Sequence, residues 1–156
     1  MKKFEIIVGS IFVSGTIIRI WDIPGAISLA GISSLLLSFF YLFFSFFLLN
    51  QKRFRDIFKR STYSGIGVYR AIVSILIGWS LFVYVISVLA NMMDWVGGWF
   101  LIFGLMWLFM CCLILFFGMQ GHKEFVVRCF KRIFIIIIIG FIALMIFSIP
   151  QMSDMM

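Results

Sequence analysis

Long runs without a charged residue constrain the fold of this chain more than any other feature. One run extends from Ala26 to Leu49 and another from Ala71 to Ala90. An α-helix needs about 20 consecutive apolar residues to cross the hydrocarbon core of a bilayer, which is about 30 Å thick. The runs are continuously apolar and do not alternate with period two, so they are typical of helices and not of barrel strands. The sequence therefore predicts an all-α, polytopic helical membrane protein.

The composition supports this class. Of the 156 residues, 64% are hydrophobic and 12% are charged, whereas a soluble domain typically has about 25% charged residues. We therefore predict a single transmembrane domain over residues 1–156. The five predicted spans are approximately residues 4–21, 26–49, 71–90, 96–118 and 133–149, and basic cytoplasmic loops are predicted at residues 50–70 and 119–132. The last span is short, so a re-entrant helix is the alternative for it.

The positions of the basic residues predict the orientation. Of the thirteen Lys and Arg residues, all but Arg19 lie at the N-terminus or in the two predicted basic loops. Under the positive-inside rule this predicts a cytoplasmic N-terminus and an external C-terminus. The net charge of +7 favours binding to anionic lipid headgroups and not to nucleic acid, because the charged residues lie between apolar runs. The candidate contacts with anionic lipid headgroups are Lys52, Arg53, Arg55, Lys59 and Arg60.

A compact polar turn, Arg19 to Ala26, joins the first two predicted spans. Its Asp-x-x-Gly spacing, followed by Leu four residues later, recurs between the third and fourth spans. This repetition predicts two tandem hairpins plus a fifth helix. The alternative is that any two hairpins crossing the same bilayer share such lengths. Arg19 and Asp22 have the i,i+3 spacing of an ion pair. The candidate turn residues are Arg19, Asp22, Pro24, Gly25, Asp94 and Gly97.

Small residues at a spacing of four predict where the helices pack. Such residues share one helix face and allow a second helix to approach closely. The candidate packing residues are Ala26, Ala30, Ser34 and Ser38 in the second predicted span and Ser74 and Gly78 in the third.

The first turn resembles that of an uncharacterised family of small bacterial multi-spanning inner-membrane proteins. In that family a hairpin, often in tandem, ends in a basic residue followed by His, Trp, Pro, Gly and Ala. The resemblance covers about Gly15 to Arg70 and includes the basic loop, although Asp22 stands where the family often has His and Ile23 where it often has Trp. It implies a location in the bacterial inner membrane.

The first hairpin is also distantly similar to the one that opens the membrane subunit of the gliding-motility motor. The proton pathway of that motor needs an intramembrane carboxylate. Glu5 lies at the extreme start of the first predicted span, where Lys2 and Lys3 can neutralise it, and no acid lies in the middle of a predicted span. We therefore do not predict the proton-conducting function of that motor for this chain.

The sequence predicts no catalytic residue, no cofactor and no metal site. Cys111, Cys112 and Cys129 lack the spacing of a zinc site and are expected to be free thiols. The remote alternative is a membrane enzyme in which His122 is the base for a Cys129 nucleophile.

A structural or interaction component of a membrane assembly is the preferred functional prediction. It needs only helix-packing faces and lipid-contacting basic segments, and its expected partners are the bilayer, further copies of the chain or other membrane proteins. A small transporter or channel subunit is the alternative, and solute flux that depends on Tyr41 or Tyr84 would support it.

Overall fold

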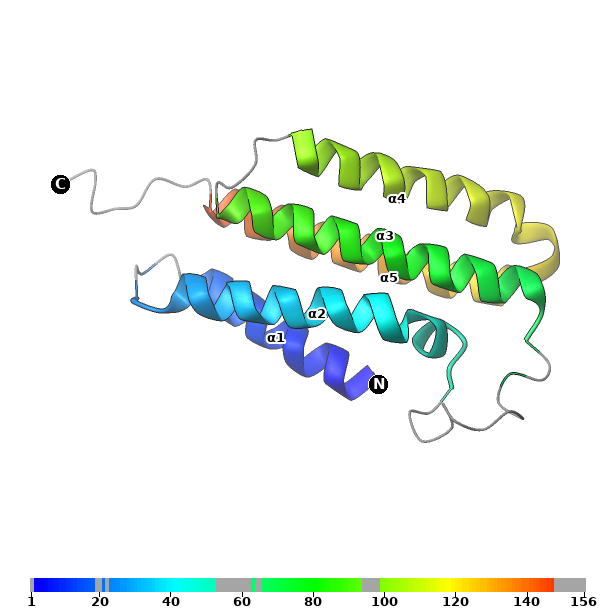
Figure 1. Cartoon of the computed structure of the whole chain (residues 1–156), viewed down its shortest axis with the longest axis horizontal. Helices are drawn as coiled ribbons and strands as arrows, with labels where there is room; N and C mark the ends of the chain where they lie inside the picture. Colours follow the sequence, from blue (N-terminus) through cyan, green and yellow to red (C-terminus); the bar gives the residue numbers. More distant parts are fainter. Residues whose placement is uncertain are drawn as a thin grey trace.

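The described part of the chain forms a bundle of five helices in which consecutive helices run antiparallel (Figure 1). The computed structural model describes residues 2–18, 21, 23–52, 63, 66–93 and 99–147. The helices are α1 (Lys2–Ile18), α2 (Ala26–Leu49), α3 (Val68–Met92), α4 (Trp99–Phe117) and α5 (Met119–Phe147). The predicted all-α class with five helices is confirmed.

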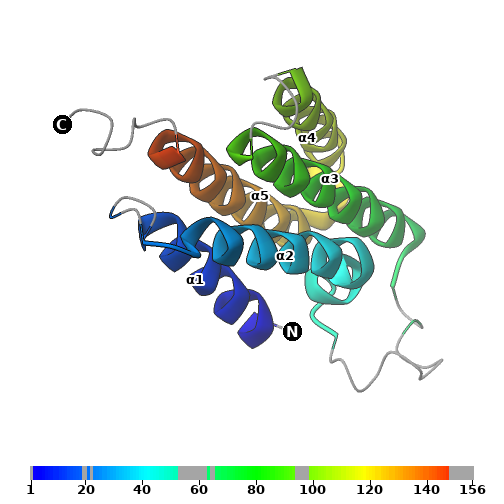
Figure 2. The same cartoon turned by 60° about the vertical axis from the view of Figure 1, so that its left-hand side comes forward.

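Helices α2 and α3 form the centre of the bundle (Figures 1 and 2). They make the most extensive helix contact, α1 packs on the outer side of α2, and α4 packs on the outer side of α3. Helix α5 touches all four of the other helices. The core is therefore densest along α2 and α3, whereas α4 keeps most of its large apolar side chains exposed.

Four of the helices are long and apolar enough to cross a membrane, namely α2, α3, α4 and residues 121–147 of α5. This is compatible with a multi-pass membrane protein. Helix α1 differs, because its 17 residues extend about 25 Å at 1.5 Å per residue, which is less than the thickness of a hydrocarbon core. Figure 1 shows that α1 begins partway along the bundle.

The two ends of the bundle differ in charge. One end holds the C-terminus of α1 and the N-terminus of α2, and we call it the turn end (Figure 1). The other end holds the C-terminus of α2 and the N-termini of α3 and α5, and we call it the basic end. Its described basic residues are Lys52, Arg70, Lys123 and Arg128.

The prediction of a loop at residues 119–132 is wrong. Helix α5 begins at Met119, directly after Gly118, and continues to Phe147 with a non-helical residue at His122. Phe125, Val126 and Cys129 are buried at helical spacing, so they form an apolar stripe that packs into the bundle. Basic residues lie between these positions. A helix boundary predicted from charge alone therefore misses the apolar stripe.

The other predicted spans agree with helices but differ at their ends. Helix α1 ends at Ile18, before the predicted Trp21, and α3 is longer than the predicted 71–90 at both ends. Helix α4 begins at Trp99 and α5 ends at Phe147, whereas residues 94–98 and 148–156 lie outside the described part of the chain. The helical stretch 133–147 belongs to a helix that is long enough to cross a membrane.

Candidate functional site

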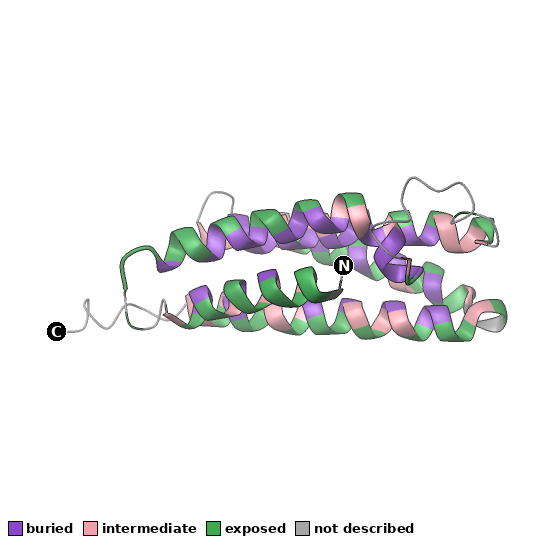
Figure 3. Cartoon of the chain, turned by 90° about the horizontal axis from the view of Figure 1, so that it is seen from below, coloured by how far each residue is buried: buried purple, intermediate pink, exposed green. Residues whose placement is uncertain are grey.

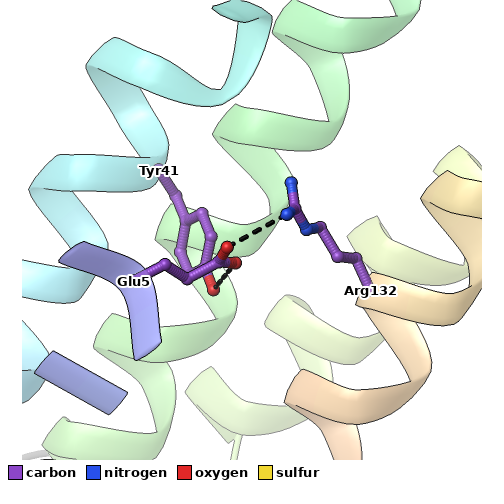
Figure 4. Close-up of polar contacts among 3 residues, drawn as sticks. All are labelled: Glu5, Tyr41 and Arg132. Atoms are coloured by element: carbon purple, nitrogen blue, oxygen red, sulfur yellow. Dashed lines mark hydrogen bonds and ion pairs between the residues drawn. The ribbon is translucent and has the colours of Figure 1, made fainter. Parts of the chain in front are cut away.

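Three polar side chains from distant parts of the sequence meet inside the bundle. The Tyr41 hydroxyl donates a hydrogen bond of 2.8 Å to Glu5 Oε1. Arg132 Nη2 lies 3.1 Å from Glu5 Oε2 in a salt bridge (Figure 4). The side chains of Arg132 and Glu5 are 19% and 16% exposed, and Tyr41 is buried. An acid from α1 is therefore held by a phenol from α2 and a guanidinium from α5.

The helix faces explain why these side chains point inward. Glu5 lies on the same face as Val8 and Phe12, which are the buried apolar residues of α1. Arg132 similarly shares a face with Cys129 and Ile136, which are buried on α5. Packing these apolar faces against the bundle carries both charged groups inward, where each needs a partner of opposite charge.

A cavity of about 650 Å³ adjoins this ion pair and lies between α1, α2, α3 and α5. Its volume is within the range of about 300–1,000 Å³ that is typical of small-molecule sites. On α1 the lining extends from Glu5 to Ser14, and on α5 from Arg132 to Gly140. The ion pair and Tyr41 therefore form the end of the cavity toward the basic end, and the rest of the lining is mainly aliphatic.

The cavity is open on the side where α1 faces α5. Four of its lining residues, Ile6, Ser10 and Ser14 on α1 and Ile135 on α5, are exposed. Figure 3 shows the many exposed positions along α1. The cavity can therefore be reached from outside the bundle on this side.

The polar groups of the cavity differ in their capacity for further hydrogen bonds. The hydroxyl of Ser34 donates to Gly31 O at 2.9 Å within its own helix, so its proton is already used. A guanidinium has five N–H donors, and Arg132 has one close contact with Glu5. Arg132 is therefore the strongest remaining donor in the lining.

Comparison with known proteins assigns no identity to the chain. No family model matches it, and no curated protein or solved structure is similar to it. No known protein therefore supplies a function for the cavity or for its ion pair.

Of the predicted turn residues, the structure describes Pro24 and Gly25, and neither lines the cavity. Pro24 and Gly25 are exposed, and Gly25 has a φ of 91°, a left-handed conformation that glycine tolerates without strain. Ala26 N–H donates to Ile23 O at 3.2 Å, which closes the turn before α2. Arg19 and Asp22, and likewise Asp94 and Gly97 of the second turn, lie outside the described residues.

All six predicted packing residues are buried in the structure, namely Ala26, Ala30, Ser34, Ser38, Ser74 and Gly78. A Cβ atom added at Gly15 would lie 3.0 Å from Ala30 N, so α1 approaches α2 closely there. A Cβ added at Gly78 would overlap the side chain of Ser45, so α3 approaches α2 equally closely.

Among the predicted headgroup contacts, Lys52 is half-buried at the end of α2. Arg53, Arg55, Lys59 and Arg60 lie outside the described residues.

The structure does not bring His122 and Cys129 together as a catalytic pair. The imidazole of His122 stacks on Tyr69 with ring centroids 5.1 Å apart. Cys129 is free and 0% exposed, and no hydrogen bond joins the two side chains in the described part of the chain. A thiol shielded from solvent in this way is poorly placed to act as a nucleophile.

Arg132 was not singled out from the sequence as a partner of Glu5. Charge proximity in the sequence favoured Lys2 and Lys3, whereas the structure pairs Glu5 with a residue from the last helix. A usable signal was present, because Glu5 falls on the apolar stripe of α1 instead of on its exposed face. An ionisable residue on such a stripe indicates a functional or structural partner within the bundle.

Proposed function

We propose that this chain is a multi-pass protein of the bacterial inner membrane that serves as an interaction component of a membrane assembly. In this proposal it works by binding, in its lateral cavity, the apolar chain of a molecule from the surrounding bilayer. The observation that carries the proposal is the aliphatic cavity of about 650 Å³, which is open toward the outside between α1 and α5. Predominantly apolar walls with a few polar groups at one end are typical of sites for amphiphilic ligands.

The proposed orientation places the N-terminus in the cytoplasm and the C-terminus outside. It is supported by the distribution of Lys and Arg, which favours a cytoplasmic basic end. The resemblance of Gly15 to Arg70 to small bacterial multi-spanning proteins supports the inner membrane as the location.

Native mass spectrometry of the detergent-purified full chain tests the binding function. The wild-type protein should retain lipid adducts, and Ser10→Trp should remove most of them because Ser10 lines the cavity at its open side. Ser28→Trp is the matched control, since Ser28 is an exposed serine on α2 that does not line the cavity. Adducts that are equally abundant in both variants would refute the proposal.

Purification of the tagged chain from native membranes tests the assembly. A partner protein or further copies of the chain should copurify, and binding should weaken in Ser10→Trp if the cavity ligand contributes to the interface. A wild-type chain that is recovered alone and monomeric would contradict the assembly but not the cavity.

A small transporter is the second candidate, and one observation favours it. Tyr41 and Tyr84, the residues on which predicted flux would depend, both line the cavity. Reconstituted vesicles should then show solute flux that Tyr84→Phe reduces, because this change removes the hydrogen bond of 3.1 Å from the Tyr84 hydroxyl to Ile137 O. Vesicles without solute flux would leave the binding function as the conclusion.

A further inference from the structure

We infer that the cavity selects a phospholipid with a net negative headgroup. One acyl chain lies in the aliphatic part of the cavity, and the headgroup phosphate accepts hydrogen bonds from the Arg132 guanidinium. This inference rests on the proposed binding function and adds the chemical class of the ligand.

The first argument is the unused hydrogen-bonding capacity of Arg132. Its salt bridge to Glu5 occupies Nη2, and Arg132 lines the cavity, so the same guanidinium brings further N–H donors to this end of the cavity. The planar guanidinium matches a phosphate in two-point hydrogen bonding, which an ammonium does not. Glu5 acts as a positioning residue because its carboxylate pairs with Nη2 of the guanidinium, and Tyr41 in turn donates a hydrogen bond to that carboxylate.

The second argument is the excess of positive charge around the ion pair. Arg128 lies one helical turn before Arg132 on the same face of α5. Lys3 lies two residues before Glu5 on α1. Glu5 neutralises one of these charges, so the surroundings remain positive and favour an anionic headgroup over a zwitterionic or cationic one.

The third argument is the depth of Arg132 in the proposed bilayer. Arg132 lies fifteen residues before the end of α5, which is about 22 Å from the turn end at 1.5 Å per residue. With the turn end at one face of a hydrocarbon core of about 30 Å, Arg132 lies close to the opposite headgroup layer. Long basic side chains at such depths reach toward the interface.

The direction of the cavity agrees with this arrangement. It extends from the ion pair toward the turn end over about 12 Å, measured from Arg132 to Gly140 along α5. The lining of this part includes the uncharged aliphatic side chains of Val88, Ile136 and Ile139. A headgroup at Arg132 and a tail toward the turn end thus match a lipid of the leaflet at the basic end.

Competition between two lipids in native mass spectrometry tests the inference. The full chain is exposed to equal amounts of phosphatidylglycerol and phosphatidylcholine with identical acyl chains. We expect the anionic lipid to be preferred about tenfold, because both headgroups offer a phosphate to Arg132 but only phosphatidylcholine also brings an ammonium into positive surroundings. Arg132→Gln should bring the two lipids close to parity, whereas Lys131→Gln, a neighbouring and exposed position, should retain most of the preference.

Two further variants keep the test decisive if Arg132→Gln fails to fold. Arg132→Lys keeps the charge and should keep part of the preference. Glu5→Gln removes the negative charge but keeps a side-chain oxygen that can accept from Arg132, so it should keep or increase the preference, whereas a purely structural role of the ion pair would make this variant lose it.

The outcomes separate the inference from the function on which it rests. Equal binding of both lipids by the wild type, or equal loss in Arg132→Gln and Lys131→Gln, overturns the anionic selectivity and leaves the cavity function standing. A wild type that binds neither lipid overturns both. A partner's transmembrane helix in place of lipid, detected as a protein complex without adducts, also overturns the inference.

Discussion

At the scale of single residues, the hydrogen bond from Tyr41 to Glu5 gives the first prediction. Tyr41→Phe keeps the ring and removes the donor of this 2.8 Å bond. The buried carboxylate oxygen then loses a partner, so the free energy of unfolding should fall by about 1–3 kcal/mol. Unfolding in mixed detergent micelles, followed by tryptophan fluorescence, measures the change. The double variant with Glu5→Gln should lose less than the sum of the two single losses, and simple additivity would show that the two side chains are not coupled.

Single residues also show which side-chain positions sequence can predict. Ala30 and Ser38 were placed on a packing face because spacing within one helix determines which residues share a face, and both are buried. The contact of Glu5 with Arg132 joins the first helix to the last. No periodicity within either helix encodes it, because it depends on how α1 and α5 are brought together by the packing of α2 and α3.

At the scale of elements, the first half of α5 gives a prediction that separates a helix from the loop expected from its charges. Val126 is 0% exposed and its neighbour Val127 is 43% exposed. Val126→Asp would bury an unpaired carboxylate and should cost several kcal/mol, or prevent accumulation of the folded protein. Val127→Asp should be tolerated. Comparable expression and melting temperatures for the two variants would contradict the helical packing of this segment.

The contact between α2 and α3 gives a second prediction at this scale. Gly78→Ala adds a Cβ that overlaps Ser45 and would lie 2.8 Å from Tyr41 O, so the helices must separate, at a cost of about 1–3 kcal/mol. Gly9→Ala is the matched control, because nothing lies within 4 Å of the added Cβ and alanine favours the helix. Thermal unfolding of both variants tests the difference. A destabilised Gly9→Ala with a neutral Gly78→Ala would contradict the close approach.

At the scale of the whole molecule, the number and order of the helices follow from the apolar runs, because a bilayer leaves few alternatives to a helix for a long uncharged segment. The helix ends follow less well. Charge predicted a boundary at Lys131 and Arg132, yet α5 extends back to Met119 because apolar residues between the charges pack into the bundle. The cavity could not be predicted at all, since it is the space left between four helices and no single segment encodes it.

The proposed orientation gives a prediction for the whole molecule. Pro24 is exposed just before α2, and Lys123 is exposed near the start of α5. The N-termini of these two helices lie at opposite ends of the bundle (Figure 1). In a variant whose three native cysteines are replaced, Pro24→Cys should react with an impermeant maleimide added to intact spheroplasts, because the turn end is proposed to be external. Lys123→Cys should react only after the membrane is permeabilised. Both cysteines should react after solubilisation, which controls for accessibility. The reverse pattern would invert the proposed topology, and labelling of both from one side would contradict a bundle that spans the membrane.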